Sequence, residues 1–210
     1  MSSNLDDFLS TVEWKKVKKT KNLLLILRDA YTCGVPAMIA KSLTDRLKEA
    51  GNYEFYLGTP PKELRLIASF LLTEFNTNLS IIVNLLPALW KRHGREDAVL
   101  YGIILANINP DLLTENIWVF FSNSLRKQEP ADDILSVCEE LIRAGRPFPS
   151  MEILELLCAK GIIFHQLVLF ILFQKFRNNQ KLTNDEMKMV NSCPGSNDLI
   201  IRIKNRLINN

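Results

Sequence analysis

Hydrophobic residues recur along this chain at the spacing of helix faces, and strand-like alternation is rare. Leu23, Leu24, Leu27, Ala30 and Tyr31, for example, fall on one side of a helix with about 3.6 residues per turn. No Asn-Gly or Asp-Gly dipeptide joins two alternating runs, as it would in a short β-hairpin. The pattern therefore predicts an all-α protein with almost no β-strand.

Prolines, glycines and capping residues divide this pattern into separate helices. Gly51 and Gly145 are expected to end helices, and Thr59 is expected to cap the helix that begins at Pro60 and Pro61. The predicted helices cover approximately residues 23–31, 36–50, 61–75, 79–90, 98–108, 110–125, 130–142, 151–159, 162–176, 185–190 and 198–207.

Two-helix units recur between residues 60 and 160, with starts near Pro60, Gly94 and Pro130. Short connections between consecutive helices favour antiparallel neighbours, and such hairpins bury their apolar faces by stacking. We therefore expect a HEAT-like stack of antiparallel helical hairpins, an α-solenoid, as one domain over residues 1–210. Residues 1–20 would form a basic N-terminal segment and 161–210 the capping helices. An irregular α-helical bundle is the alternative.

Composition adds that the chain can bury a large core, since 47% of its residues are hydrophobic and 23% are charged. Its most apolar stretch, residues 162–173, is too short to cross a bilayer, and the acidic N-terminus lacks the apolar run of an export signal. The four cysteines are scattered without a C-x-x-C pair. These features predict a soluble, cytoplasmic protein that binds no membrane, metal or cofactor.

Familiar catalytic motifs are missing from the sequence. It contains no phosphate-binding P-loop, no G-x-G-x-x-G, no H-E-x-x-H and no G-x-S-x-G, and His93 and His165 are far apart. An enzyme of an unrecognised class is therefore the third of three readings, behind two binding functions.

Positive charge gathers in four short segments although the net charge is only +3. These are residues 15–21 with five lysines, 91–95, 175–181 and 202–206. Each segment is either a solvated helix face or a place where phosphates bind. The candidate phosphate contacts are Lys91, Arg92, His93, Arg95, Lys175 and Arg177.

Trp90 and Trp118 are the candidate aromatics of a binding cleft, with core packing as the alternative for each. Trp90 directly precedes Lys91 and Arg92, and an aromatic ring beside guanidinium groups can stack on a base.

Two segments resemble the HEAT-like DNA alkylation repair glycosylases. Residues 55–68 (FYLGTPPKELRLIA) are similar to that family's F-x-G-[VI]-x-x-P-x-L-R-x-I-A segment. Residues 89–90 and 94–99 (LW and GREDAV) are similar to its L-W-x-x-x-x-[HR]-E-x-x-x-x-A segment. The resemblance covers about residues 55–107, a quarter of the chain.

This resemblance implies a basic concave surface that holds duplex DNA by its backbone, and a cleft that excises alkylated bases with tryptophans and an aspartate. The family's W-D-x-V-D segment corresponds here to Trp118-Val119-Phe120-Phe121-Ser122, which keeps the tryptophan but neither acidic position. Trp118 is therefore carried over as a cleft aromatic, and no catalytic residue is assigned.

Two binding functions follow from these observations. The first is a helical-repeat protein that binds duplex DNA through its phosphates and has weak or no base-excision activity. The alternative is a non-enzymatic scaffold whose groove holds a segment of a partner protein.

Overall fold

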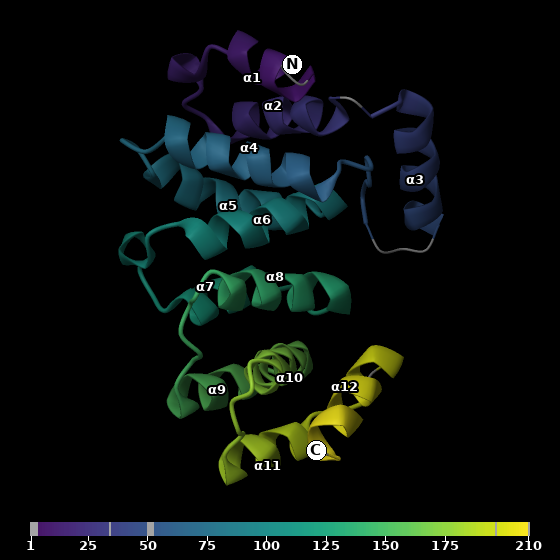
Figure 1. Cartoon of the computed structure of the whole chain (residues 1–210), viewed down its shortest axis with the longest axis vertical. Coiled ribbons are helices and arrows are strands. Elements are labelled where there is room, and N and C mark those ends of the chain that lie inside the picture. Colours follow the sequence, from purple (N-terminus) through teal and green to yellow (C-terminus); the bar gives the residue numbers. More distant parts are fainter. Residues whose placement is uncertain (1–3, 34, 50–52, 196, 210) are drawn as a thin grey trace. The chain divides into compact units, whose positions relative to one another are not determined.

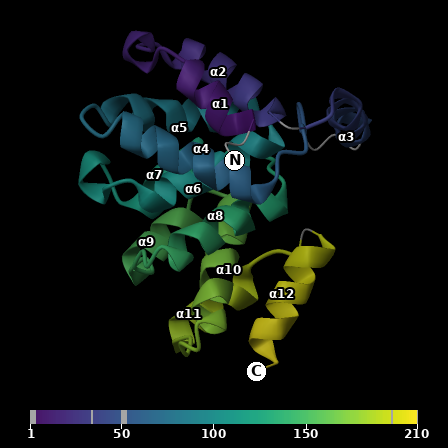
Figure 2. The same cartoon turned by 45° about the horizontal axis from the view of Figure 1, so that its top comes forward.

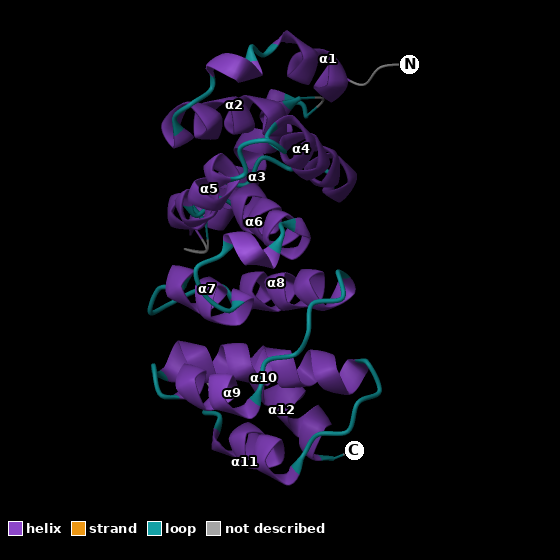
Figure 3. Ribbon diagram, turned by 90° about the vertical axis from the view of Figure 1, so that its left-hand side faces the viewer, coloured by secondary structure: helices purple, strands orange, loops and turns teal. Residues whose placement is uncertain are grey.

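The computed structural model describes residues 4–33, 35–49, 53–195 and 197–209. These residues form twelve α-helices and two short 3-10 turns, and none of them forms a β-strand (Figure 3). The all-α prediction is confirmed. Gly51, the expected end of the helix that follows Pro36, lies outside the described residues.

The chain divides into two compact units, Met1–Leu112 and Leu113–Asn210. The sequence predicted one domain of stacked hairpins. The predicted starts of the two-helix units, near Pro60, Gly94 and Pro130, each lie one residue before an observed helix start, at Pro61, Arg95 and Ala131. The stacking of these hairpins into one solenoid stays a prediction.

The N-terminal unit is a layered set of helices with α3 set to one side of the layers (Figures 1 and 2). Helix α6 packs against α4 and α5 and is buried on nearly every side, while α2 packs against α1, α4 and α5. Its elements are α1 (Asn4–Thr11), η1 (Trp14–Lys16), α2 (Thr20–Thr32), α3 (Ala37–Glu49), α4 (Pro61–Glu74), α5 (Ser80–Arg92), α6 (Arg95–Asn107) and η2 (Pro110–Leu112).

The C-terminal unit is built around α10, whose apolar sequence fits a helix covered on most sides. Helix α10 packs against α8, α9, α11 and α12, and α11 begins with a capping box between Thr183 and Glu186. The elements are α7 (Ile117–Ser124), α8 (Ala131–Arg143), α9 (Met151–Cys158), α10 (Ile162–Arg177), α11 (Asn184–Ser192) and α12 (Asp198–Ile208).

Three local predictions were wrong. The single helix predicted over 110–125 is broken into η2 and α7, because the side chain of Asn116 caps a new start by accepting a hydrogen bond from the Trp118 N–H. Helix α1 was not predicted within the N-terminal segment. Thr59 does not cap α4: Pro60 holds that position, and the Thr59 hydroxyl donates to the Tyr31 carbonyl at 2.8 Å.

Within the described residues, no single helix has both the length and the apolar character needed to cross a bilayer. Helices α2 and α3 meet that composition test only as a pair, which bends by 110° at its junction.

Two of the four cysteines are buried and two are half-buried, and this difference predicts which thiols react with a reagent in solution. Cys138 and Cys193 are 0% and 2% exposed, whereas Cys33 and Cys158 are half-buried. Burial raises the pKa of Cys193 to about 11, which lowers its thiolate population further. An aromatic disulfide reagent at about pH 8 should therefore modify Cys33 and Cys158 in the native protein and spare the other two until denaturant is added. Equal rates at all four native thiols would contradict this burial pattern.

Candidate functional site

The two segments that carry the family resemblance meet in the N-terminal unit. The extended chain around Phe55 runs beside the turn between α5 and α6 and forms an isolated parallel bridge with Gly94. The Arg95 N–H donates to the Phe55 carbonyl at 3.0 Å, and the Glu54 N–H donates to the His93 carbonyl at 3.0 Å. The two segments therefore contact each other at one place, the start of α6, and their hydrogen bonds hold that helix start in position.

Gly94 is required at this turn because the Phe55 ring lies against its backbone. A side-chain Cβ at residue 94 would overlap with that ring. Phe55 is 2% exposed, and the guanidinium carbons of Arg28 and Arg92 lie 5.0 and 5.4 Å from its ring centroid. At these distances the guanidinium groups gain cation–π attraction from the ring.

Glu96, in the first turn of α6, binds the loop that precedes α4. Its Oε1 accepts hydrogen bonds from three consecutive backbone N–H groups: Leu57 at 2.9 Å, Gly58 at 2.9 Å and Thr59 at 3.3 Å. The positive φ of Gly58, 83°, belongs to the left-handed region that favours glycine and lets these N–H groups converge. Burial raises the pKa of Glu96, and the three N–H donors act in the opposite direction.

Asp97 is fully buried and binds Arg92 through both of its carboxylate oxygens. Arg92 donates from Nε to Oδ2 and from Nη2 to Oδ1, each at 2.6 Å, and the Tyr31 hydroxyl donates to Oδ1 at 2.9 Å. Arg92 Nη1 also donates to the Leu24 carbonyl. Burial raises the pKa of Asp97, whereas the Arg92 guanidinium lowers it. The bidentate pair therefore joins α2, α5 and α6.

These two carboxylates are structural rather than catalytic in this arrangement. Glu96 and Asp97 are 1% and 0% exposed, so neither is accessible to a substrate from solution. Their partners are backbone amides, a guanidinium and a phenol, which are groups that hold segments together.

The predicted phosphate contacts of residues 91–95 have unequal access to solvent. The Arg92 side chain is only 20% exposed and its donors point inward, so its assignment as a DNA contact is corrected to a core ion-pair residue. His93 adopts a left-handed turn with φ 58°, and its ring lies 5.8 Å from that of Tyr53. Arg95 is half-buried at the first position of α6, and Lys91 is exposed.

Trp90 and Trp118 are buried in this structure, as the core-packing alternative expects, and neither is exposed to a cleft. Trp90 is 4% exposed and packs edge-on against Tyr101, with 5.0 Å between ring centroids. Trp118 is 0% exposed, and its indole N–H donates to the Pro147 carbonyl at 2.9 Å. A large aromatic ring contributes most to stability when it is fully packed, and both of these tryptophan rings are packed in the interior.

Lys175 and Arg177, the candidates of the C-terminal unit, both form ion pairs. Lys175 Nζ lies 2.6 Å from an oxygen of Glu186, and the two side chains are 19% and 8% exposed. Arg177 pairs with Glu139 at 2.6 Å, and about half of each side chain is exposed. Lys175 therefore anchors the capping box of α11, whereas Arg177 still reaches solvent.

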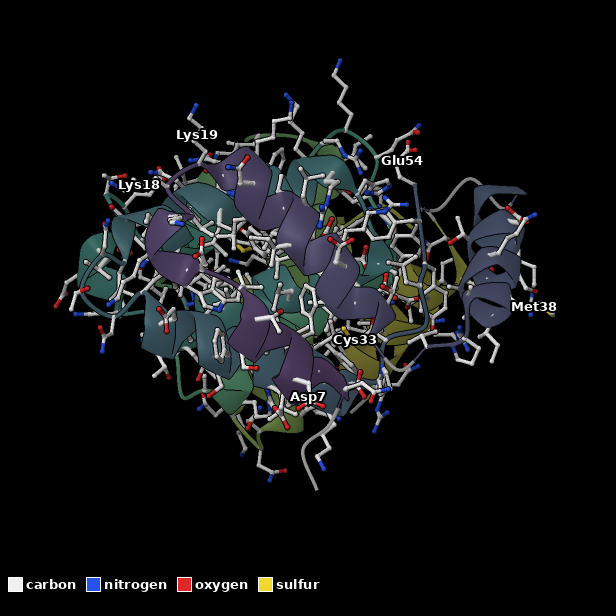
Figure 4. The ribbon with its side chains drawn as sticks, turned by 90° about the horizontal axis from the view of Figure 1, so that it is seen from above. Asp7, Lys18, Lys19, Cys33, Met38 and Glu54 are labelled. Carbon is white, nitrogen blue, oxygen red and sulfur yellow. The ribbon has the colours of Figure 1, made fainter. Side chains whose placement is uncertain are left out.

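The most accessible basic cluster is the segment of residues 15–21, here called the lysine segment. All five of its lysines are exposed; Lys16 pairs with Glu13, whereas the side chains of Lys15, Lys18, Lys19 and Lys21 form no hydrogen bond or ion pair with a described residue. Figure 4 shows Lys18 and Lys19 at the rim of the N-terminal unit, directed away from its helices. The sequence predicts a basic cluster here, but none of its lysines is among the candidate phosphate contacts. The density of five lysines within seven residues is the sequence signal that could have identified this segment as a phosphate contact.

Comparison with known proteins adds no relative. No protein-family model matches the chain. No curated protein and no solved structure matches it either. The resemblance to the alkylation-repair glycosylases stays a prediction.

Replacing Arg92 should destabilise the N-terminal unit severely. Arg92→Ala leaves the Asp97 carboxylate buried without its counter-charge, and breaking a buried pair in this way costs about 3–5 kcal/mol. Urea unfolding followed by circular dichroism measures the loss. The matched control is Lys91→Ala, an exposed neighbour that should change stability by less than about 0.5 kcal/mol. If both variants unfold at the same urea concentration, the pair does not hold this unit together.

Proposed function

We propose that this protein binds duplex DNA through its phosphate backbone, that the lysine segment makes the principal contact, and that it excises no base. The observation that carries the proposal is the set of four exposed lysines on one short segment, Lys15, Lys18, Lys19 and Lys21, whose side chains pair with no described residue. Duplex DNA carries about one negative charge per 1.7 Å of helix axis, and each neutralised phosphate releases counterions. Unpaired lysines gain this free energy without first breaking an ion pair.

The lysine segment is held on a fixed turn, which distinguishes it from a loose basic tail. Trp14 and Val17 are each 7% exposed and fasten the segment to the core. The Trp14 indole N–H donates to the Leu9 carbonyl at 2.9 Å, and its ring lies 5.1 Å from that of Phe70. A fixed backbone means that binding DNA orders the lysine side chains without also ordering the chain.

The start of α2 adds a second favourable feature at the same place. The helix begins at Thr20, and Lys19 at its N-cap position provides no side-chain hydrogen bond to the first N–H groups. Unfilled N–H groups and the positive end of a helix dipole attract phosphate. Lys18, Lys19 and Lys21 flank this helix start in the sequence and are exposed, so their charges add to the positive potential around it.

Two of the other candidate cations are already engaged in buried ion pairs, which favours the lysine segment as the DNA contact. Turning Arg92 or Lys175 toward DNA would leave Asp97 or Glu186 buried without a counter-charge. The absence of base excision is proposed because Trp118 is buried and its neighbours lack the acidic positions of the W-D-x-V-D segment. A HEAT-like repeat architecture belongs to the same proposal, supported by the helix starts at Pro61, Arg95 and Ala131.

Fluorescence anisotropy with a labelled duplex of about 20 base pairs, at about 50 and 200 mM salt, tests the proposal. The variant carries Lys15→Gln, Lys18→Gln, Lys19→Gln and Lys21→Gln. We expect wild type to bind and the variant to lose at least about tenfold in affinity at low salt. The slope of log affinity against log salt should also become shallower by about three to four, since each phosphate contact contributes about 0.9.

A charge-matched control separates a defined contact from general attraction. It carries Lys41→Gln, Lys62→Gln, Lys91→Gln and Lys127→Gln, which are exposed lysines outside the lysine segment. This variant has the same net charge as the first and should keep most of the wild-type affinity. An equal loss in both variants, or no binding by wild type at low salt, would refute the proposal.

A further inference from the structure

An open groove of about 820 Å³ lies in the C-terminal unit, where α10 and α12 end and α11 approaches them. Figure 2 shows α12 passing beside α10 and α11 in this unit. The groove is lined by residues 176–177, 179–182, 187 and 206–208. Its volume falls within the range of about 300–1,000 Å³ that is typical of ligand sites.

The charge of this groove is of one sign. Arg177, Lys181 and Arg206 contribute to the lining, and no carboxylate does. Lys181 is exposed, and its side chain forms no ion pair with a described residue, whereas Arg177 is paired with Glu139. Residues 175–210 contain seven basic and three acidic side chains, so the surrounding chain reinforces the positive field.

The remaining lining is largely apolar. Leu182 and Met187 are half-buried, Leu207 is 4% exposed, and Ile208 is 42% exposed. An exposed isoleucine beside buried leucine surface offers contact area to an apolar side chain. Phosphate groups would make no favourable contact with this apolar surface. Its position beside the cations therefore favours a ligand that carries both acidic and apolar groups.

The walls of the groove are fastened to one another, so the site is preformed. Lys175 joins α10 to α11 through Glu186 at 2.6 Å, which also neutralises the one buried carboxylate of this corner. Lys204 of α12 donates to the carbonyls of Asn191 and Cys193 at 2.7 and 2.8 Å. Preformed sites bind with a smaller entropic cost than sites that must order.

We propose that this groove binds an acidic, amphipathic segment of a partner protein. One large apolar side chain of the segment packs against Leu182, Leu207 and Ile208, and carboxylates on either side of it pair with Lys181 and Arg206. This is recognition by an apolar anchor with flanking charge complementarity. The inference is independent of the DNA contact proposed for the lysine segment.

The probe is a fluorescein-labelled helical peptide of about 16 residues, with leucines on one face at i and i+4 and glutamates beside them. We expect saturable binding by wild type that weakens at least about tenfold when Lys181→Glu and Arg206→Glu are combined. The matched control is Arg202→Glu with Lys188→Glu, two exposed cations of α12 and α11 that do not line the groove; the Lys188 pair with Asp185 is exposed to solvent. The control should weaken binding by less than about threefold.

Ile208→Ser tests the apolar anchor separately, and it should weaken the peptide several-fold without changing the salt dependence. Circular dichroism and urea unfolding confirm that each variant is folded. The proposal is overturned if the groove and control variants lose peptide affinity equally, or if wild type shows no saturable binding. It is overturned as well if a peptide with lysine in place of glutamate binds as tightly as the acidic peptide. It is also overturned if duplex DNA, rather than the peptide, loses affinity in the groove variants. Failure of the DNA contact at the lysine segment would leave the peptide result unchanged.

Discussion

Two adjacent carboxylates buried in the first turn of α6 fix the arrangement of the N-terminal unit. Removing a carboxylate from water costs several kcal/mol unless donors and counter-charges replace the lost hydration. Glu96 finds its donors in the backbone before α4, and Asp97 finds its own in Arg92 and Tyr31. The N-terminus of α6 adds the positive end of its dipole. The start of α6 is therefore held by α2, α5 and the segment before α4 together.

This requirement separates structural cations from cations free to bind a partner. Arg92 belongs to the first class because its guanidinium is the counter-charge of Asp97. In the C-terminal unit, Lys175 has the same role toward Glu186. Four lysines of the lysine segment belong to the second class, because they are exposed on a turn that Trp14 and Val17 hold in place; Figure 4 shows two of them, Lys18 and Lys19, at its edge. A basic cluster in the sequence can therefore be assigned as a binding site only after the ion-pair partner of each cation has been identified.

Most helices could be predicted from the sequence, because prolines and glycines stand where helices begin and end. The break between η2 and α7 was missed because the capping role of Asn116 depends on local backbone geometry. The candidate site was harder. Tyr31 and Asp97 are distant in the chain, so their hydrogen bond has no local signal. The run Lys91-Arg92-His93-Gly94-Arg95 reads as an exposed basic turn, and only tertiary contacts show that Arg92 points inward. The lysine segment is visible in the sequence as a cluster, but the sequence does not show that Lys16 pairs with Glu13 while the other four lysines form no ion pair with a described residue.

Hydrogen exchange measured by mass spectrometry, with and without a duplex of about 20 base pairs, tests this account most directly. In the free protein, amides of residues 89–97 should already exchange slowly, because the buried pair holds that turn closed. Added duplex should slow exchange in residues 12–24, around the lysine segment and the first turn of α2, and leave 89–97 unchanged. Duplex-dependent protection at 89–97 without any at 12–24 would contradict the account, since Arg92 would then be a DNA contact rather than a structural one.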